Sequence, residues 1–135
     1  MYPLFCTLLF FGGCPENTGE PDSVIRINNY SNDDIVFFFQ YNSRYDTLLS
    51  TFPFPLNAEN AKERTILING TDSIPGTYKR TLKNNPDKVL MLFLFSHDVI
   101  LNESWDKITN GYLILKRYDL TLDSLESRNW IIDYP

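Results

Sequence analysis

Two uninterrupted apolar runs stand out in the pattern of hydrophobic and polar positions along this chain. Residues 35–39 are Ile-Val-Phe-Phe-Phe, and residues 89–95 are all apolar. A strand with one face in water alternates apolar and polar residues, whereas a strand covered on both faces is apolar throughout. We therefore expect both runs to be strands buried on both faces, with residues 89–95 at the centre of the sheet.

Weaker patterns predict the other strands. Residues 25–28 alternate apolar and polar side chains, which is typical of a half-buried strand. Turn-forming residues follow up to position 34, so we expect this strand and residues 35–39 to form an antiparallel hairpin. Three further segments have strand character: residues 64–68, 112–118 and 130–135.

Short helices are expected over residues 77–84, over residues 102–110 and after Thr121. The last of these has the clearest start. Thr121 is a good N-cap residue, and Leu120 and Leu125 have the spacing of a hydrophobic staple across the cap.

The order of these elements predicts the fold class. Strands come first and then alternate with short helices, which favours an α+β domain built on one mixed, mostly antiparallel sheet with two or three short helices. A β-sandwich with peripheral helices is the alternative, because two fully apolar strands require cover on both faces of the sheet.

The N-terminus has a different composition from the rest. The apolar run from Leu4 to Phe11 is shorter than the roughly 20 residues that span a bilayer. It has the length of a signal-peptide core and ends in Phe11-Gly12-Gly13-Cys14, a layout that resembles a bacterial lipobox. We therefore expect residues 1–13 to be a lipoprotein signal peptide and Cys14 to carry the lipid; the alternative is an ordinary apolar strand.

The next residues predict a tether. Residues 15–22 contain two prolines, a glycine and three acids but no apolar residue, which is typical of a flexible linker. We therefore divide the chain into the signal peptide, a lipidated cysteine and tether over residues 14–22, and a single globular domain over residues 23–135. Cys6 would leave with the signal and Cys14 would be lipidated, so no disulfide is expected in the mature chain.

Charge and motifs narrow the function classes. The net charge is −5 and the basic residues are scattered, so nucleic-acid binding is not expected. The sequence has no glycine-rich phosphate loop, no nucleophile elbow and no metal-ligand spacing, so it predicts neither a cofactor nor a metal. The expected partners are the membrane, through the lipid on Cys14, and an envelope protein or a glycan.

His97 is the one histidine and lies between Ser96 and Asp98. A catalytic interpretation makes it a general base, oriented by a carboxylate and acting on a serine. Neighbouring residues on a strand point to opposite faces, however, so we favour a polar strand end over a catalytic site.

An aromatic-rich segment is the best binding candidate. Tyr41, Tyr45, Phe52 and Phe54 lie on a stretch with no regular pattern, where they would form a platform for sugar rings or for the apolar surface of a partner. The alternative is that these rings fold inward and attach a loop to the core.

The C-terminal segment carries a resemblance. Residues 116–121 are Lys-Arg-Tyr-Asp-Leu-Thr, and residues 129–135 are Asn-Trp-Ile-Ile-Asp-Tyr-Pro. This ending resembles that of small lipoproteins of unknown function in Bacteroidota. The resemblance extends loosely over residues 24–135 and implies a location in the cell envelope rather than a chemistry.

Secreted proteins of these bacteria are often O-glycosylated where Asp precedes Ser or Thr and an apolar residue follows. The pattern occurs at four positions of this chain: Ser23, Thr47, Ser73 and Ser124. Ser124 falls on the last expected helix, where a polar helix residue is the simpler interpretation.

These observations together predict a lipid-anchored protein of the cell envelope, on the outer membrane, that acts as a non-enzymatic binding or accessory module. The alternatives are a small envelope hydrolase that uses His97 and nearby acids, and a purely structural lipoprotein.

Overall fold

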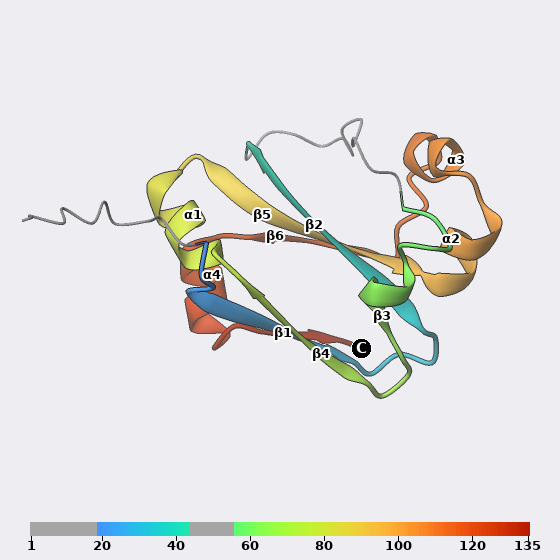
Figure 1. The fold of residues 1–135 in the computed structure, drawn as a ribbon, viewed down its shortest axis with the longest axis horizontal. Coiled ribbons are helices and arrows are strands. Elements are labelled where there is room, and N and C mark those ends of the chain that lie inside the picture. The colour runs from blue at the N-terminus through green and yellow to red at the C-terminus, as the bar shows by residue number, and fades with distance from the viewer. Residues whose placement is uncertain (1–18, 44–55) are drawn as a thin grey trace, which may run out of the picture.

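The strands of this protein are divided between two sheets (Figure 1). The computed structural model describes residues 19–43 and 56–135. Within these residues, seven strands and four short α-helices confirm the α+β class.

The first sheet is mixed and has the order β4-β1-β7. The central strand β1 (Ser23–Asn29) pairs antiparallel with β4 (Thr71–Gly76) and parallel with β7 (Ile131–Tyr134). β7 therefore brings the C-terminal segment beside the first strand of the domain.

The second sheet is antiparallel and has the order β3-β2-β5-β6. Its strands are β2 (Ile35–Ser43), β3 (Thr65–Ile66), β5 (Lys88–Ser96) and β6 (Lys116–Leu120). β2 and β5 are the longest strands of the described chain and pair along their whole length, from Ile35 opposite Ser96 to Ser43 opposite Lys88.

Helices lie at both ends of the sheets (Figure 1). At one end are α1 (Tyr78–Asn84) and α4 (Leu122–Ser127), and at the other are α2 (His97–Asn102) and α3 (Trp105–Asn110). A 3₁₀ turn, η1 (Lys62–Arg64), precedes β3. None of the helices in the described part is long and apolar enough to cross a membrane.

Strand β5 is buried on both faces, as the sequence predicts. One face packs in a cluster with strands of the first sheet, through Leu90, Leu92, Leu94, Ile25 and Ile27. The other face packs against α2 and α3, through Met91, Phe93, Phe95, Ile100 and Ile108. The apolar run of β2 is divided between the same two clusters.

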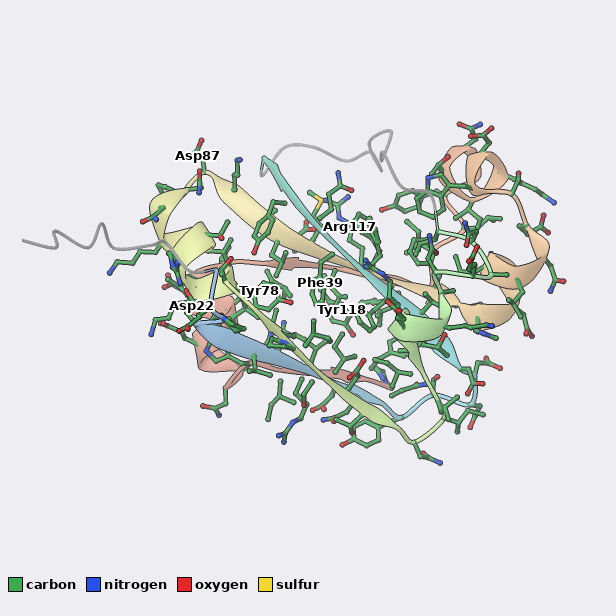
Figure 2. All side chains as sticks on the ribbon, viewed as in Figure 1. Asp22, Phe39, Tyr78, Asp87, Arg117 and Tyr118 are labelled. Atoms are coloured by element: carbon green, nitrogen blue, oxygen red, sulfur yellow. The ribbon has the colours of Figure 1, made fainter. Side chains whose placement is uncertain are left out.

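Aromatic side chains fill one end of the space between the sheets. Phe39, Tyr78 and Tyr118 point into this space (Figure 2), and the rings of Phe39 and Tyr78 lie 5.6 Å apart. Burial raises the pKa of Tyr78 to about 12, with the neighbouring Tyr41 adding to the shift and Arg64 opposing it.

The expected hairpin of β1 and β2 is wrong, because the two strands belong to different sheets. The side chain of Asn29 explains the change of direction between them. It is fully buried, and its Nδ2 donates to the carbonyl oxygens of Asp33, Ile66 and Leu67 at 2.8, 3.1 and 3.2 Å. These bonds fix the loop after β1 so that the chain crosses to the second sheet.

Other differences concern the ends of elements. The expected strand over residues 112–118 begins only at Lys116, because Tyr112 has a left-handed backbone with φ 50°. Strand β4 is not evident in the sequence because it contains Pro75, which is tolerated here since β4 lies at a sheet edge.

The start of α4 confirms the expected cap and staple. Leu120 and Leu125, on either side of the cap, are both buried in the core between the sheets. Thr121 and Ser124 form a capping box, in which each side chain accepts a hydrogen bond from the backbone N–H of the other.

Two leucine-to-alanine substitutions test this core. Leu94 on β5 is fully buried, so Leu94→Ala should lower the free energy of unfolding by about 2–5 kcal/mol through lost burial and the cavity left behind. Leu67 is 63% exposed, so Leu67→Ala should change the free energy of unfolding by less than about 0.5 kcal/mol. Urea unfolding followed by tryptophan fluorescence measures both, and equal losses would contradict the burial described for β5.

Candidate functional site

The predicted lipidation site and most of the predicted aromatic platform lie outside the described residues: Cys14, Tyr45, Phe52 and Phe54, together with the possible glycosylation site Thr47. The remaining platform residue, Tyr41 on β2, is half-buried and packs against the core between the sheets. Burial raises the pKa of Tyr41, a hydrogen bond with Thr81 opposes this, and the charge of Asp22 adds to it.

The other candidate modification sites have different surroundings. Ser73 is exposed on the edge strand β4. Ser23 is half-buried, and its Oγ donates to Asp22 Oδ1 at 2.7 Å and accepts from the N–H of Lys79 at 3.1 Å. Ser124 is half-buried, and its Oγ accepts from the N–H of Thr121 in the capping box. Ser73 is therefore the most accessible of the three described hydroxyls.

His97 is the first residue of α2, not the end of a strand. It lines a small polar cavity of about 190 Å³. The lining residues are Asn32, Asp33, Asp34, Ile68, Ser96, His97 and Asp98. Among the described residues, no hydrogen bond or ion pair joins the imidazole to Ser96 or to a carboxylate.

This cavity has the residue types of a hydrolytic site without its contacts. A nucleophile and its base normally lie within hydrogen-bond reach, and a third group orients the base. Asp34, one of the three carboxylates that line the cavity, instead accepts the N–H of Ile68 through Oδ1 at 2.9 Å. Within the described residues, His, Cys, Asp and Glu also form no group that could hold a metal ion.

Exposed apolar side chains gather at this end of the molecule. Apart from Val24, every exposed large apolar side chain of the described residues lies on α2, on the connections beside it or on the adjoining loops: Tyr30, Leu67, Ile68, Leu101, Tyr112, Leu113 and Leu115. We call this the loop end. Tyr30 and Leu67 are the most exposed of the set, at 61% and 63%.

Hydrogen bonds give the loop end a fixed backbone. The buried Asn29 joins the β1–β2 loop to the β3–β4 loop through the carbonyls of Asp33 and Leu67, and Asp34 holds the N–H of Ile68. Two exposed apolar residues are therefore presented on ordered loops. The sequence does not show this, because residues 66–68 are an apolar run that also fits the end of a buried strand.

The chain enters the domain at the opposite end, beside α1 (Figure 2). Asp22 Oδ2 accepts the N–H of Arg80 at 2.8 Å and lies 3.7 Å from Arg80 Nε. The guanidinium of Arg80 also donates to the carbonyl oxygen of Glu20 at 3.3 Å. We call this the tether end, because these contacts attach residues 20–22 to α1.

These contacts lower the pKa of the Asp22 carboxyl. Desolvation tends to raise its pKa, but hydrogen bonds from Ser23, Arg80 and Lys79 and the charge of Arg80 outweigh this effect. The net result is a pKa below the ordinary value of 3.8. The contacts therefore favour the charged form of Asp22 in the folded protein.

No protein-family model matches this chain, and no curated protein or solved structure is significantly similar to it.

The contacts of Asp22 predict that this residue makes a pH-dependent contribution to the stability of the fold. Because the pKa of Asp22 is lower in the folded than in the unfolded state, its contribution is present at neutral pH and is lost as the pH falls through the folded value. Asp22→Asn should lower the free energy of unfolding by up to about 1 kcal/mol at neutral pH. This difference from wild type should shrink below about pH 4.

A suitable control is Asp87→Asn at the same end of the molecule (Figure 2). Asp87 is exposed and has no ion pair or hydrogen-bond partner in the part of the chain that the structure describes. Its replacement should leave the stability at neutral pH unchanged. Equal effects of the two substitutions, measured by urea unfolding across the pH range, would contradict the assigned contacts of Asp22.

Proposed function

We propose that this protein is a lipid-anchored, non-enzymatic binding module of the cell envelope, located on the outer membrane, and that its loop end contacts an envelope protein. Cys14 carries the lipid, and the predicted tether, residues 15–22, ends in the contacts of Glu20 and Asp22 with Arg80. The resemblance of the C-terminal segment to small Bacteroidota lipoproteins supports the same location.

The observation that carries the binding role is the concentration of exposed apolar side chains at the loop end. Most soluble proteins scatter such residues singly over the surface, whereas a gathered patch is typical of an interaction site. Among the described residues, Val24 is the only exposed large apolar side chain that lies outside the loop end.

The position of the tether indicates which end of the domain would face a partner. Strand β1 runs from Ser23 at the tether end to Asn29 at the loop end, so a lipid on Cys14 would leave the loop end facing away from the membrane (Figure 1). A partner in the envelope would then meet Tyr30, Leu67 and Ile68 first.

Charge at the loop end indicates the chemistry of the partner. Asp33 and Asp98 are exposed beside Ile68 around the small cavity of His97. An apolar surface with an acidic rim is complementary to an apolar patch surrounded by Lys or Arg. The partner is therefore expected to be a protein with a basic rim around its contact surface.

Site-specific crosslinking in the native envelope tests this proposal. A photo-crosslinking phenylalanine derivative at position 67 should give a discrete adduct with one protein, because Leu67 is 63% exposed at the loop end. The same group at position 87 is the control, since Asp87 is exposed at the tether end.

The adduct should also weaken when Ile68→Ser is added to the position-67 variant, because this removes apolar surface beside the crosslinker. An adduct that forms equally from positions 87 and 67, or no adduct from position 67, would contradict a binding role for the loop end.

A further inference from the structure

A larger cavity lies at the tether end. Its volume is about 360 Å³, within the range of roughly 300–1,000 Å³ that is usual for small-molecule sites. It is bounded by the start of β1, the first turn of α1 and the turn between α4 and β7. The lining residues are Asp22, Ser23, Val24, Lys79, Asn129 and Trp130.

One wall of this cavity is held by hydrogen bonds. Ser23 Oγ accepts the N–H of Lys79 and donates to Asp22 Oδ1, and Asp22 Oδ2 accepts the N–H of Arg80. The carboxylate and hydroxyl are therefore fixed relative to α1. A preformed wall of this kind reduces the ordering that a ligand must impose.

The opposite wall is a turn with unfavourable backbone geometry. Asn129 and Trp130 have left-handed φ values of 54° and 61°, a conformation that favours glycine and is rare for a bulky side chain. The backbone N–H of Trp130 donates to the carbonyl oxygen of Leu125, and the carbonyl oxygen of Trp130 accepts from the N–H of Arg26. These two hydrogen bonds hold the turn in place. Such strain is concentrated at functional sites in proteins.

Trp130 connects this turn to the rest of the domain. It is partly buried and packs against the core between the sheets, and it also lines the cavity. A bulky aromatic residue therefore occupies a position where a glycine would fit the backbone with less strain.

The lining selects for a neutral, hydroxyl-rich ligand. It contains one carboxylate, which is paired with Arg80, and one ammonium, so the groups that line it carry no net charge. Among the described residues, neither the ammonium of Lys79 nor the carboxamide of Asn129 has a hydrogen-bond or ion-pair partner. These groups supply donors and an acceptor, while Trp130 and Val24 supply apolar surface.

We propose that this cavity binds one sugar unit of a neutral glycan. The sugar ring packs against Trp130, and its hydroxyls bond to Lys79, Asn129 and the Asp22 carboxylate. This site goes beyond the proposed function, because it lies at the opposite end from the protein-binding surface.

Two-dimensional NMR of the full chain tests the proposal. The probes are the methyl glycosides of galactose, mannose and N-acetylglucosamine at millimolar concentrations, with methyl galacturonide as the charged counterpart of the galactoside. At least one neutral glycoside should shift the indole N–H resonance of Trp130. Trp105 is an internal control, because it packs against Phe38 and Phe95 on the far side of the second sheet.

Two variants assign the binding to the cavity. Lys79→Met removes the ammonium but keeps the backbone N–H that Ser23 accepts, and Asn129→Gly removes the carboxamide at a backbone conformation that glycine adopts freely. Each should weaken the affinity by about tenfold or less, as expected for the loss of one hydrogen bond. Lys83→Met, on the same helix but outside the cavity, should leave it unchanged.

Three outcomes would overturn the sugar site. These are no shift of the Trp130 indole with any neutral glycoside, tighter binding of the galacturonide than of the galactoside, and unchanged affinity in both cavity variants. Each is separate from the loop-end proposal, because the crosslink at position 67 depends on neither Trp130 nor Lys79.

Discussion

The structure depends on the burial of one strand on both of its faces. Seven consecutive apolar residues of β5, Val89 to Phe95, are each less than 5% exposed. Alternate side chains of a strand point to opposite sides, so this run needs two separate apolar layers to cover it. The first sheet supplies one layer, and α2, α3 and residues 56–61 supply the other. The need for the first sheet on one face and for α2 and α3 on the other therefore follows from the composition of a single segment.

This layered core also separates the two ends of the molecule. β1, β2 and β5 extend between the ends, so the chain enters at Asp22 while the β1–β2 and β3–β4 loops lie at the far end (Figure 1). The clamp between Asp22 and Arg80 fixes the point of entry, and Asn29 fixes the loops. The exposed apolar loops therefore lie at the end of the domain opposite to the point where the chain enters.

The sequence predicts the parts of this fold that depend on local patterns. The burial of β5, the short helix before Pro86 and the cap of α4 at Thr121 are confirmed, because apolar runs, prolines and capping residues act over a few positions. The pairing of β1 is not predictable in this way, since its paired residues in β4 and β7 lie 43–53 and 105 residues further along the chain. The proposed sites show the same limit: Cys14 is a local motif, whereas the cavity at Trp130 combines residues from β1, α1 and the α4–β7 turn.

The central functional claim is that the domain is held to a membrane through Cys14, and the intact mass of the protein purified from its native host tests it most directly. We expect a mature chain that begins at Cys14 and carries the added mass of acyl chains, and a Cys14→Ala variant without that mass. An unmodified wild-type chain that keeps residues 1–13 would contradict the anchor and, with it, the orientation assigned to the loop end.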